Sequence, residues 1–121
     1  MKKYNDPLGN KSFSLALRVI KLQKSLQSEH REYALSRHLF VAGTSVGSLI
    51  RESFSAQSDQ QFVKKFHKAR EHCYETIYWL ELLYQSKLIE KKEFELLKNL
   101  STEIAKMIAS SIRTKKKNIK N

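Results

Sequence analysis

The chain has 121 residues and carries 23 Lys and Arg against 12 Asp and Glu, a formal net charge of +11. With 40% hydrophobic and 29% charged residues but only three Gly and one Pro, the composition favours one soluble globular domain and excludes a loop-rich or all-β chain. No apolar run approaches the roughly 18 residues of a membrane span, and the first residues lack the apolar core of a signal peptide, so we expect a cytoplasmic protein with no membrane partner.

The first helix is expected over about residues 11–27, after a flexible lead-in at residues 1–10. Two apolar stripes run along it, and basic residues fill the arc between them. The first stripe comprises Leu15, Val19, Leu22 and Leu26, and the second comprises Phe13, Ala16, Leu17 and Ile20. Because one bundle core covers a single stripe, a second contact is predicted for this helix.

The second helix is expected over about residues 32–54, after a short polar connection at residues 28–32. Its apolar period continues through a run of small residues, although each interior Gly costs about 1 kcal/mol relative to Ala. We therefore keep the helix and expect Gly43 and Gly47, one turn apart, to let another backbone come close. The hydroxyls of Thr44, Ser45 and Ser48 should bond to helix carbonyls or cross to a partner.

The third and longest helix is expected over residues 58–86, with Ser58 and Gln61 forming a capping box. Its core stripe comprises Phe62, Phe66, Ala69, Cys73, Thr76 or Ile77, Leu80, and Leu83 or Tyr84. Its outward face is basic in the first half, whereas the second half is apolar nearly all round. That second half is covered either by two neighbours of the same chain or by another subunit.

The fourth helix is expected over residues 90–114, and residues 115–121 form a basic tail that we predict to be disordered. Four helices with three short connections predict an all-α domain at residues 11–114. Its expected architecture is an antiparallel up-down-up-down four-helix bundle.

Residues 35–83 resemble the small bacterial four-helix-bundle family of the 23S rRNA intervening-sequence protein, to which the accessory variability protein of diversity-generating retroelements is related. The match depends on Ala42-Gly43-Thr44-Ser45-Val46-Gly47 with Ile50 and Glu52, on Ala56-Gln57-Ser58 with Phe62, and on Glu75-Thr76 before Tyr78-Trp79-Leu80. Apolar positions of the first helix extend the resemblance to roughly residues 12–112. The chain departs from the family at Ser48 and Leu49, where relatives usually carry Asn.

The resemblance implies an antiparallel bundle that assembles as a cyclic homopentamer and serves as a nucleic-acid-associated scaffold without catalysis. The second stripe of the first helix and the apolar end of the third would supply the ring contacts. The residues nominated for this oligomer interface are Phe13, Leu17, Ile20, Tyr78, Trp79 and Leu82.

No metal or cofactor is expected. A di-iron bundle requires Glu-x-x-His on two helices, and no Glu here has a His three residues later. His67 and Glu71 lie one turn apart, but two ligands do not hold a metal. Cys73 lies on a core stripe and is the single cysteine, which excludes an internal disulfide and a thiolate cluster.

An enzymatic alternative is a ribonuclease that uses Arg31 and His38, whose spacing fits the Arg-to-His pattern of some helical-bundle ribonucleases. Glu52 and Glu75 admit two interpretations. They form an acid–base pair, or each accepts hydrogen bonds across a helix or subunit contact. Neither pattern identifies a small-molecule substrate, and we predict a protein that is not an enzyme.

The charge excess favours a polyanionic partner, although lysines that merely solubilise the protein would give the same count. The residues nominated to bind nucleic acid are Arg18, Lys21, Lys24, Lys64, Lys65, Lys68, Lys115, Lys116 and Lys117. No exposed aromatic side chain is expected among them, which favours structured RNA or a duplex backbone over stacked single strands. The predicted function is an RNA-associated scaffold, and the other alternative is a scaffold for an acidic or polymerase-type protein partner.

Overall fold

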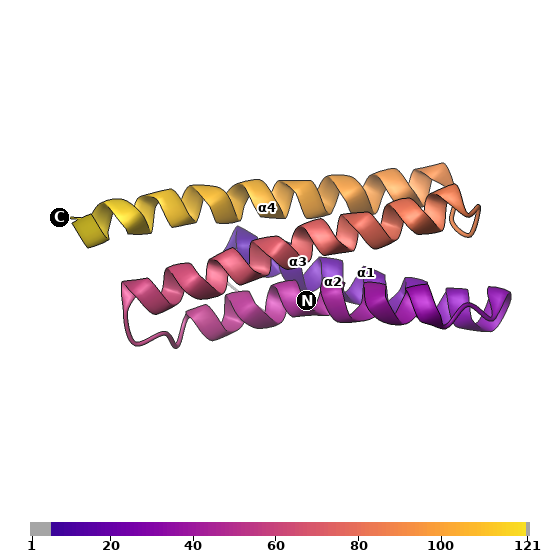
Figure 1. Ribbon diagram of the computed structural model, residues 1–121, viewed down its shortest axis with the longest axis horizontal. Coiled ribbons are helices and arrows are strands. Elements are labelled where there is room, and N and C mark those ends of the chain that lie inside the picture. Colours follow the sequence, from indigo (N-terminus) through magenta and orange to yellow (C-terminus); the bar gives the residue numbers. More distant parts are fainter. Residues whose placement is uncertain (1–5, 121) are drawn as a thin grey trace.

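The computed structural model describes residues 6–120 and consists there of four α-helices and no strand: α1 Pro7–His30, α2 Ala34–Ser53, α3 Asp59–Gln85 and α4 Lys91–Lys120 (Figure 1). Each helix packs against the next one in the chain, and α1 also contacts α4. The predicted all-α four-helix bundle is confirmed. None of the helices within residues 6–120 combines the length and hydrophobicity that a membrane crossing requires.

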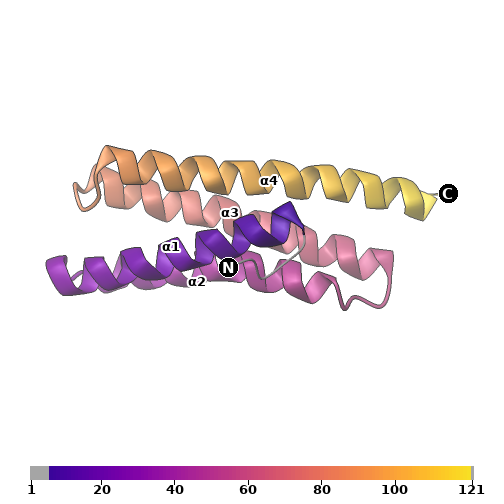
Figure 2. The same ribbon diagram turned by 180° about the vertical axis from the view of Figure 1, so that it is seen from behind.

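Helix α1 begins earlier than predicted. The Asp6 side chain caps it by accepting a hydrogen bond of 2.6 Å from the Gly9 amide, and Pro7 occupies its first turn, where the missing N–H costs nothing. The predicted flexible lead-in is therefore wrong for residues 6–10, and residues 1–5 lie outside the described part of the chain. Figure 2 shows that α1 nevertheless starts well inside the bundle, so it runs beside only part of α4.

The start of α3 confirms the predicted cap in a modified form. Ser58 Oγ accepts a bond of 3.1 Å from the Gln61 amide, as expected. Gln61 Oε1 accepts from the amide of Gln57, one residue before the residue that a standard capping box would use.

The predicted core stripes are buried. Those of α1 are Leu15, Val19, Leu22 and Leu26, and those of α3 are Phe66, Ala69, Cys73, Thr76, Leu80 and Leu83. Phe62 is only partly buried, and Val63 takes its place in the core. The buried hydroxyls of Ser36, Thr76 and Ser101 donate to carbonyls of the preceding turn, so their burial leaves no unpaired donor.

The small-residue run of α2 is helical, as predicted, and packs against α1. A Cβ on Gly43 would lie 2.7 Å from Val19 Cγ2, and one on Gly47 would lie 3.4 Å from the Ser12 carbonyl oxygen. The hydroxyls of Thr44 and Ser45 donate to carbonyls of the preceding turn. Gly43 therefore lets the Val19 side chain of α1 approach closely, whereas a Cβ at Gly47 would meet the α1 backbone at an ordinary contact distance.

Helix α4 continues through the predicted tail and ends at Lys120. The predicted end of the bundle at residue 114 is therefore wrong, and so is the predicted disorder of the tail at residues 115–120, while residue 121 of that tail lies outside the described part of the chain. Lys115 holds this segment against α3, because its Nζ lies 3.3 Å from Oδ1 of Asp59. Cationic residues also suit the negative end of a helix dipole. In both views the last turns of α4 project beyond the start of α3 (Figures 1 and 2).

Candidate nucleic-acid interface

The outer edge of the contact between α2 and α3 opens into a basic hollow of about 390 Å³. Lys64, Lys65 and Lys68 reach it from the first three turns of α3, since a spacing of three and four residues places them on one face. Leu49, Glu52 and Gln61 complete its lining. Three of the nominated lysines are thus brought together, although helix α2 contributes a carboxylate that the prediction did not place beside them.

A second hollow, of about 520 Å³, adjoins the first and shares with it Glu52 and Lys65. Its other lining residues, Ser48, Arg51 and Ser55, were not nominated from the sequence. No local pattern identifies them, because they join the lysines only where α2 and α3 lie side by side. We name the two hollows together the α2–α3 basic surface.

An ion pair lies where the two hollows meet. Lys65 Nζ is 3.0 Å from Oε1 of Glu52, and Ser48 Oγ lies 3.5 Å from Oε2 of the same carboxylate. Glu52 thus accepts from Lys65 across the contact between α2 and α3, whereas its serine partner, Ser48, lies one turn earlier on the same helix. Four cationic side chains and one carboxylate line the surface, a composition that suits the phosphates of a nucleic acid.

The other nominated cations lie elsewhere. Arg18, Lys21 and Lys24 are exposed on α1, and Lys116 and Lys117 are exposed near the end of α4. Lys115 is only partly exposed because it pairs with Asp59 and places its Nζ 4.7 Å from the centroid of the Phe62 ring. The nine nominated cations therefore do not form one continuous patch.

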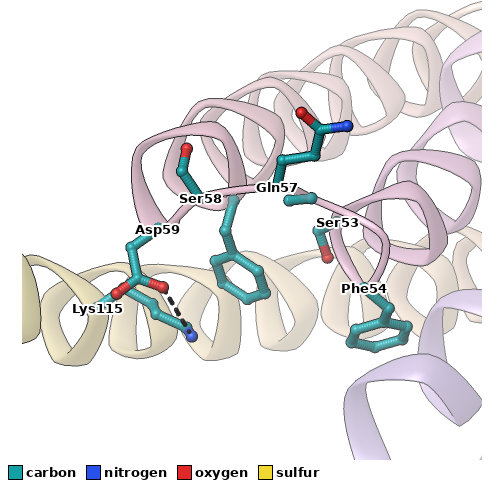
Figure 3. Close-up of a pocket in the computed structure, with 8 residues that line it drawn as sticks. Ser53, Phe54, Gln57, Ser58, Asp59 and Lys115 are labelled. Carbon is teal, nitrogen blue, oxygen red and sulfur yellow. Dashed lines mark hydrogen bonds and ion pairs between the residues drawn. The ribbon is translucent and has the colours of Figure 1, made fainter.

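Lys115 also borders a third hollow, of about 390 Å³, at the turn between α2 and α3 (Figure 3). Asp59 and Lys115 meet at one side of it, and Phe54 lies at the other. The Phe54 side chain is 56% exposed. Phe54 is thus an exposed aromatic side chain near Lys115, but it does not line the two hollows that hold Lys64, Lys65 and Lys68.

The residues nominated for the oligomer interface are exposed or partly exposed. Leu17 and Tyr78 are 54% and 53% exposed, and Phe13, Ile20, Trp79 and Leu82 are half-buried. Trp79 is stacked on His38 of α2, with ring centroids 4.4 Å apart, and Tyr78 meets Trp79 edge-on at 5.0 Å. Part of the Trp79 ring is thus covered within the chain.

The residues considered for catalysis lie at the end of α1, on α2 and on α3. Arg31 ends α1 in a left-handed conformation with φ of 52°, and His38 is the ring stacked on Trp79. Glu75 Oε1 lies 2.7 Å from Nδ1 of His72, without the alignment of an N–H···O hydrogen bond.

Cys73 is buried and free. Burial raises the pKa of its thiol to about 12, and the charge of the nearby Arg70 acts in the opposite direction. At neutral pH the thiol is therefore protonated and a poor nucleophile.

Over residues 6–120, no three His, Cys, Asp or Glu side chains gather closely enough to hold a metal ion.

Comparison with known proteins identifies the relatives of this fold. The chain is similar to a solved structure of a protein with unknown function from the S23 ribosomal protein family of Bacteroides thetaiotaomicron, with 39% sequence identity and a TM-score of 0.86. That alignment covers 87% of this chain and 97% of the other. No curated protein sequence matches the chain. The family model of the 23S rRNA-intervening sequence protein matches residues 8–110, which confirms the resemblance seen in the sequence. The chain therefore belongs to the 23S rRNA-intervening sequence protein family.

Proposed function

We propose that this protein is a non-catalytic, cytoplasmic, RNA-associated scaffold that binds phosphates at the α2–α3 basic surface. The observation that supports this function is the convergence of Lys64, Lys65 and Lys68 on one hollow, in a chain of formal charge +11. Lysine contacts to phosphates give affinity without reading the base sequence. The name of the family refers to ribosomal RNA, which favours RNA over DNA as the polyanion.

The proposal includes the topology and the assembly. The four helices run antiparallel, up-down-up-down, and five copies form a closed ring through the exposed parts of α1 and α3. Leu17 and Tyr78, both more than half exposed, are the apolar side chains that such a ring would cover. Each subunit would then repeat the α2–α3 basic surface, and weak phosphate contacts would add through avidity.

RNA binding is tested by fluorescence anisotropy with a labelled 20-base-pair RNA duplex and its DNA counterpart over a range of KCl concentrations. We expect the RNA to bind more tightly than the DNA, and the affinity to fall steeply as salt rises. Absence of binding to either duplex at low salt would contradict the proposed function. Cleavage of the RNA by the wild type that is lost in His38→Ala would contradict its non-catalytic part.

The assembly is tested by light scattering. A pentamer of the 14.2 kDa chain has five times that mass, about 71 kDa. Tyr78→Glu should lower the mass, because it places a charge in the proposed contact. Tyr33→Glu is the matched control, since Tyr33 is equally exposed, at 54%, but lies at the turn between α1 and α2. A wild type that elutes as a monomer would contradict the ring.

A further inference from the structure

The ion pair between Glu52 and Lys65 separates the two hollows of the α2–α3 basic surface. These two residues are the only ones that line both hollows. Lys64 and Lys68 lie on one side of the pair, and Ser48, Arg51 and Ser55 lie on the other. Any chain of phosphates that occupies both hollows must therefore pass over Glu52 and Lys65.

The ion pair is exposed to solvent, so that another anion can reach Lys65. The side chains of Lys65 and Glu52 are 35% and 52% exposed, and their charged atoms lie 3.0 Å apart. Exposed ion pairs of this kind contribute little to stability, because water already solvates both groups. A phosphate can therefore replace the carboxylate as the partner of Lys65 without disturbing the bundle.

Glu52 opposes phosphate binding in two ways. Its carboxylate forms an ion pair with Lys65, the lysine that lines both hollows. Its negative charge also repels a phosphate that enters either hollow. No other acidic side chain is among the residues that line these two hollows. Glu52 is thus the one lining group whose charge has the same sign as the ligand.

We propose that the two hollows form a single binding site for consecutive phosphates of an RNA backbone, and that Glu52 is an internal competitor which these phosphates displace from Lys65. This inference rests on the proposed function and adds to it a second half-site on α2 and a residue that limits affinity. It assigns to Glu52 a role in tuning the binding, whereas Lys64 and Lys68 hold the phosphates. The pair would keep the surface from holding polyanions indiscriminately.

The test compares Glu52→Gln with Glu103→Gln. Both substitutions remove one negative charge from an exposed ion pair, since Glu103 pairs with Lys11 at 3.3 Å on α1 and α4, outside the two hollows. Gln is close in size to Glu and keeps a side-chain oxygen for Ser48, so the fold should be unchanged, which circular dichroism verifies. The probe is the 20-base-pair RNA duplex, titrated at 50 to 200 mM KCl.

We expect Glu52→Gln to bind the duplex about five times more tightly and Glu103→Gln to stay within about twofold of the wild type. The affinity of Glu52→Gln should also depend more steeply on salt. Lys65 can then neutralise a phosphate without competition from the carboxylate, and the RNA releases one more counterion. Lys65→Gln should cost more affinity in the Glu52→Gln background than in the wild type, since only there is Lys65 unopposed.

Equal affinities for Glu52→Gln and Glu103→Gln, with binding retained by the wild type, would overturn the competitor and leave the proposed function standing. Failure of both the wild type and Glu52→Gln to bind the duplex would overturn both. Tight binding by Glu52→Gln with no binding by the wild type would also overturn the proposal, because the phosphates would then fail to displace the carboxylate from Lys65.

Discussion

Helix α2 makes two contacts of opposite character. Toward α1 the contact is so close that a Cβ on Gly43 would lie 2.7 Å from Val19 Cγ2. Toward α3 the outer edge of the contact opens into hollows of about 390 and 520 Å³ lined by cationic side chains. At Gly43 one side of the helix thus leaves no room for a methyl group, whereas the other side leaves room for a ligand.

The difference separates side chains that pack the bundle from exposed side chains that are free to bind a ligand. The α1 side fixes how two helices approach each other, because a stiff β-branched residue packs against a glycine. On the α3 side, Lys64 and Lys68 are exposed and add charge without packing. Substitutions on the first side should therefore change stability, and those on the second should change binding.

The largest expected effect concerns the two glycines of α2. Gly43→Ala should destabilise the protein by about 1 to 2 kcal/mol, because the displacement of the buried Val19 outweighs the better helix propensity of Ala. Gly47→Ala should be neutral or stabilising by up to about 1 kcal/mol, since its nearest neighbour is at an ordinary contact distance of 3.4 Å. Urea denaturation measures both free energies of unfolding.

The cause of the Gly43 effect can be isolated. Removing the opposing methyl groups with Val19→Ala should make the Gly43→Ala substitution much less costly than in the wild type. Costs that simply add in the double variant would show that the clash with Val19 is not responsible.

The next effect concerns the α3 side. Lys64→Gln with Lys68→Gln should weaken binding to duplex RNA about tenfold, or about 1.4 kcal/mol, with no change in the urea midpoint. The matched control is Lys91→Gln with Lys92→Gln, which removes the same charge from exposed residues at the start of α4, away from the start of α3 (Figure 1). An equal loss of affinity in the control would show that the effect depends on the net charge of the protein and not on the position of the two lysines.

A smaller loss is expected on α1. Arg18→Gln with Lys21→Gln should weaken RNA binding only about threefold, since these exposed side chains do not line the α2–α3 basic surface. The same anisotropy titration ranks the two pairs. A larger loss on α1 than on α3 would move the main binding surface to α1.

The smallest effect is expected for an ion pair between α1 and α4. Glu103→Gln breaks the 3.3 Å contact with Lys11, whose side chain is 36% exposed, and should change the free energy of unfolding by less than about 0.5 kcal/mol. Urea denaturation of this variant beside the wild type measures the change. A loss above 1 kcal/mol would show that the contact between α1 and α4 depends on this pair.

The interior of the bundle follows directly from the sequence. The period of three and four residues gave the buried stripes of α1 and α3, and the same period identified the small-residue run of α2 as helix despite its glycines. Burial of one helix face is a regular, local signal, because every turn repeats it.

The end of α4 and the binding surface depend on contacts that no local pattern contains. Helix α4 continues past residue 114 because Lys115 reaches Asp59, a residue 56 positions away in the sequence. Arg51 and Ser55 join the lysines only because α2 and α3 lie side by side. The second side of the basic surface could therefore not be nominated before the helices were placed in space.

The central claim is that Lys64 and Lys68 hold phosphates of RNA. The most direct test is the slope of the logarithm of RNA affinity against the logarithm of salt concentration, because each phosphate contact adds about 0.9 to its magnitude on duplex DNA. The account predicts that Lys64→Gln with Lys68→Gln flattens this slope by about 1.8, while the Lys91 and Lys92 control keeps the wild-type slope. An unchanged slope in the Lys64 and Lys68 variant would contradict the account.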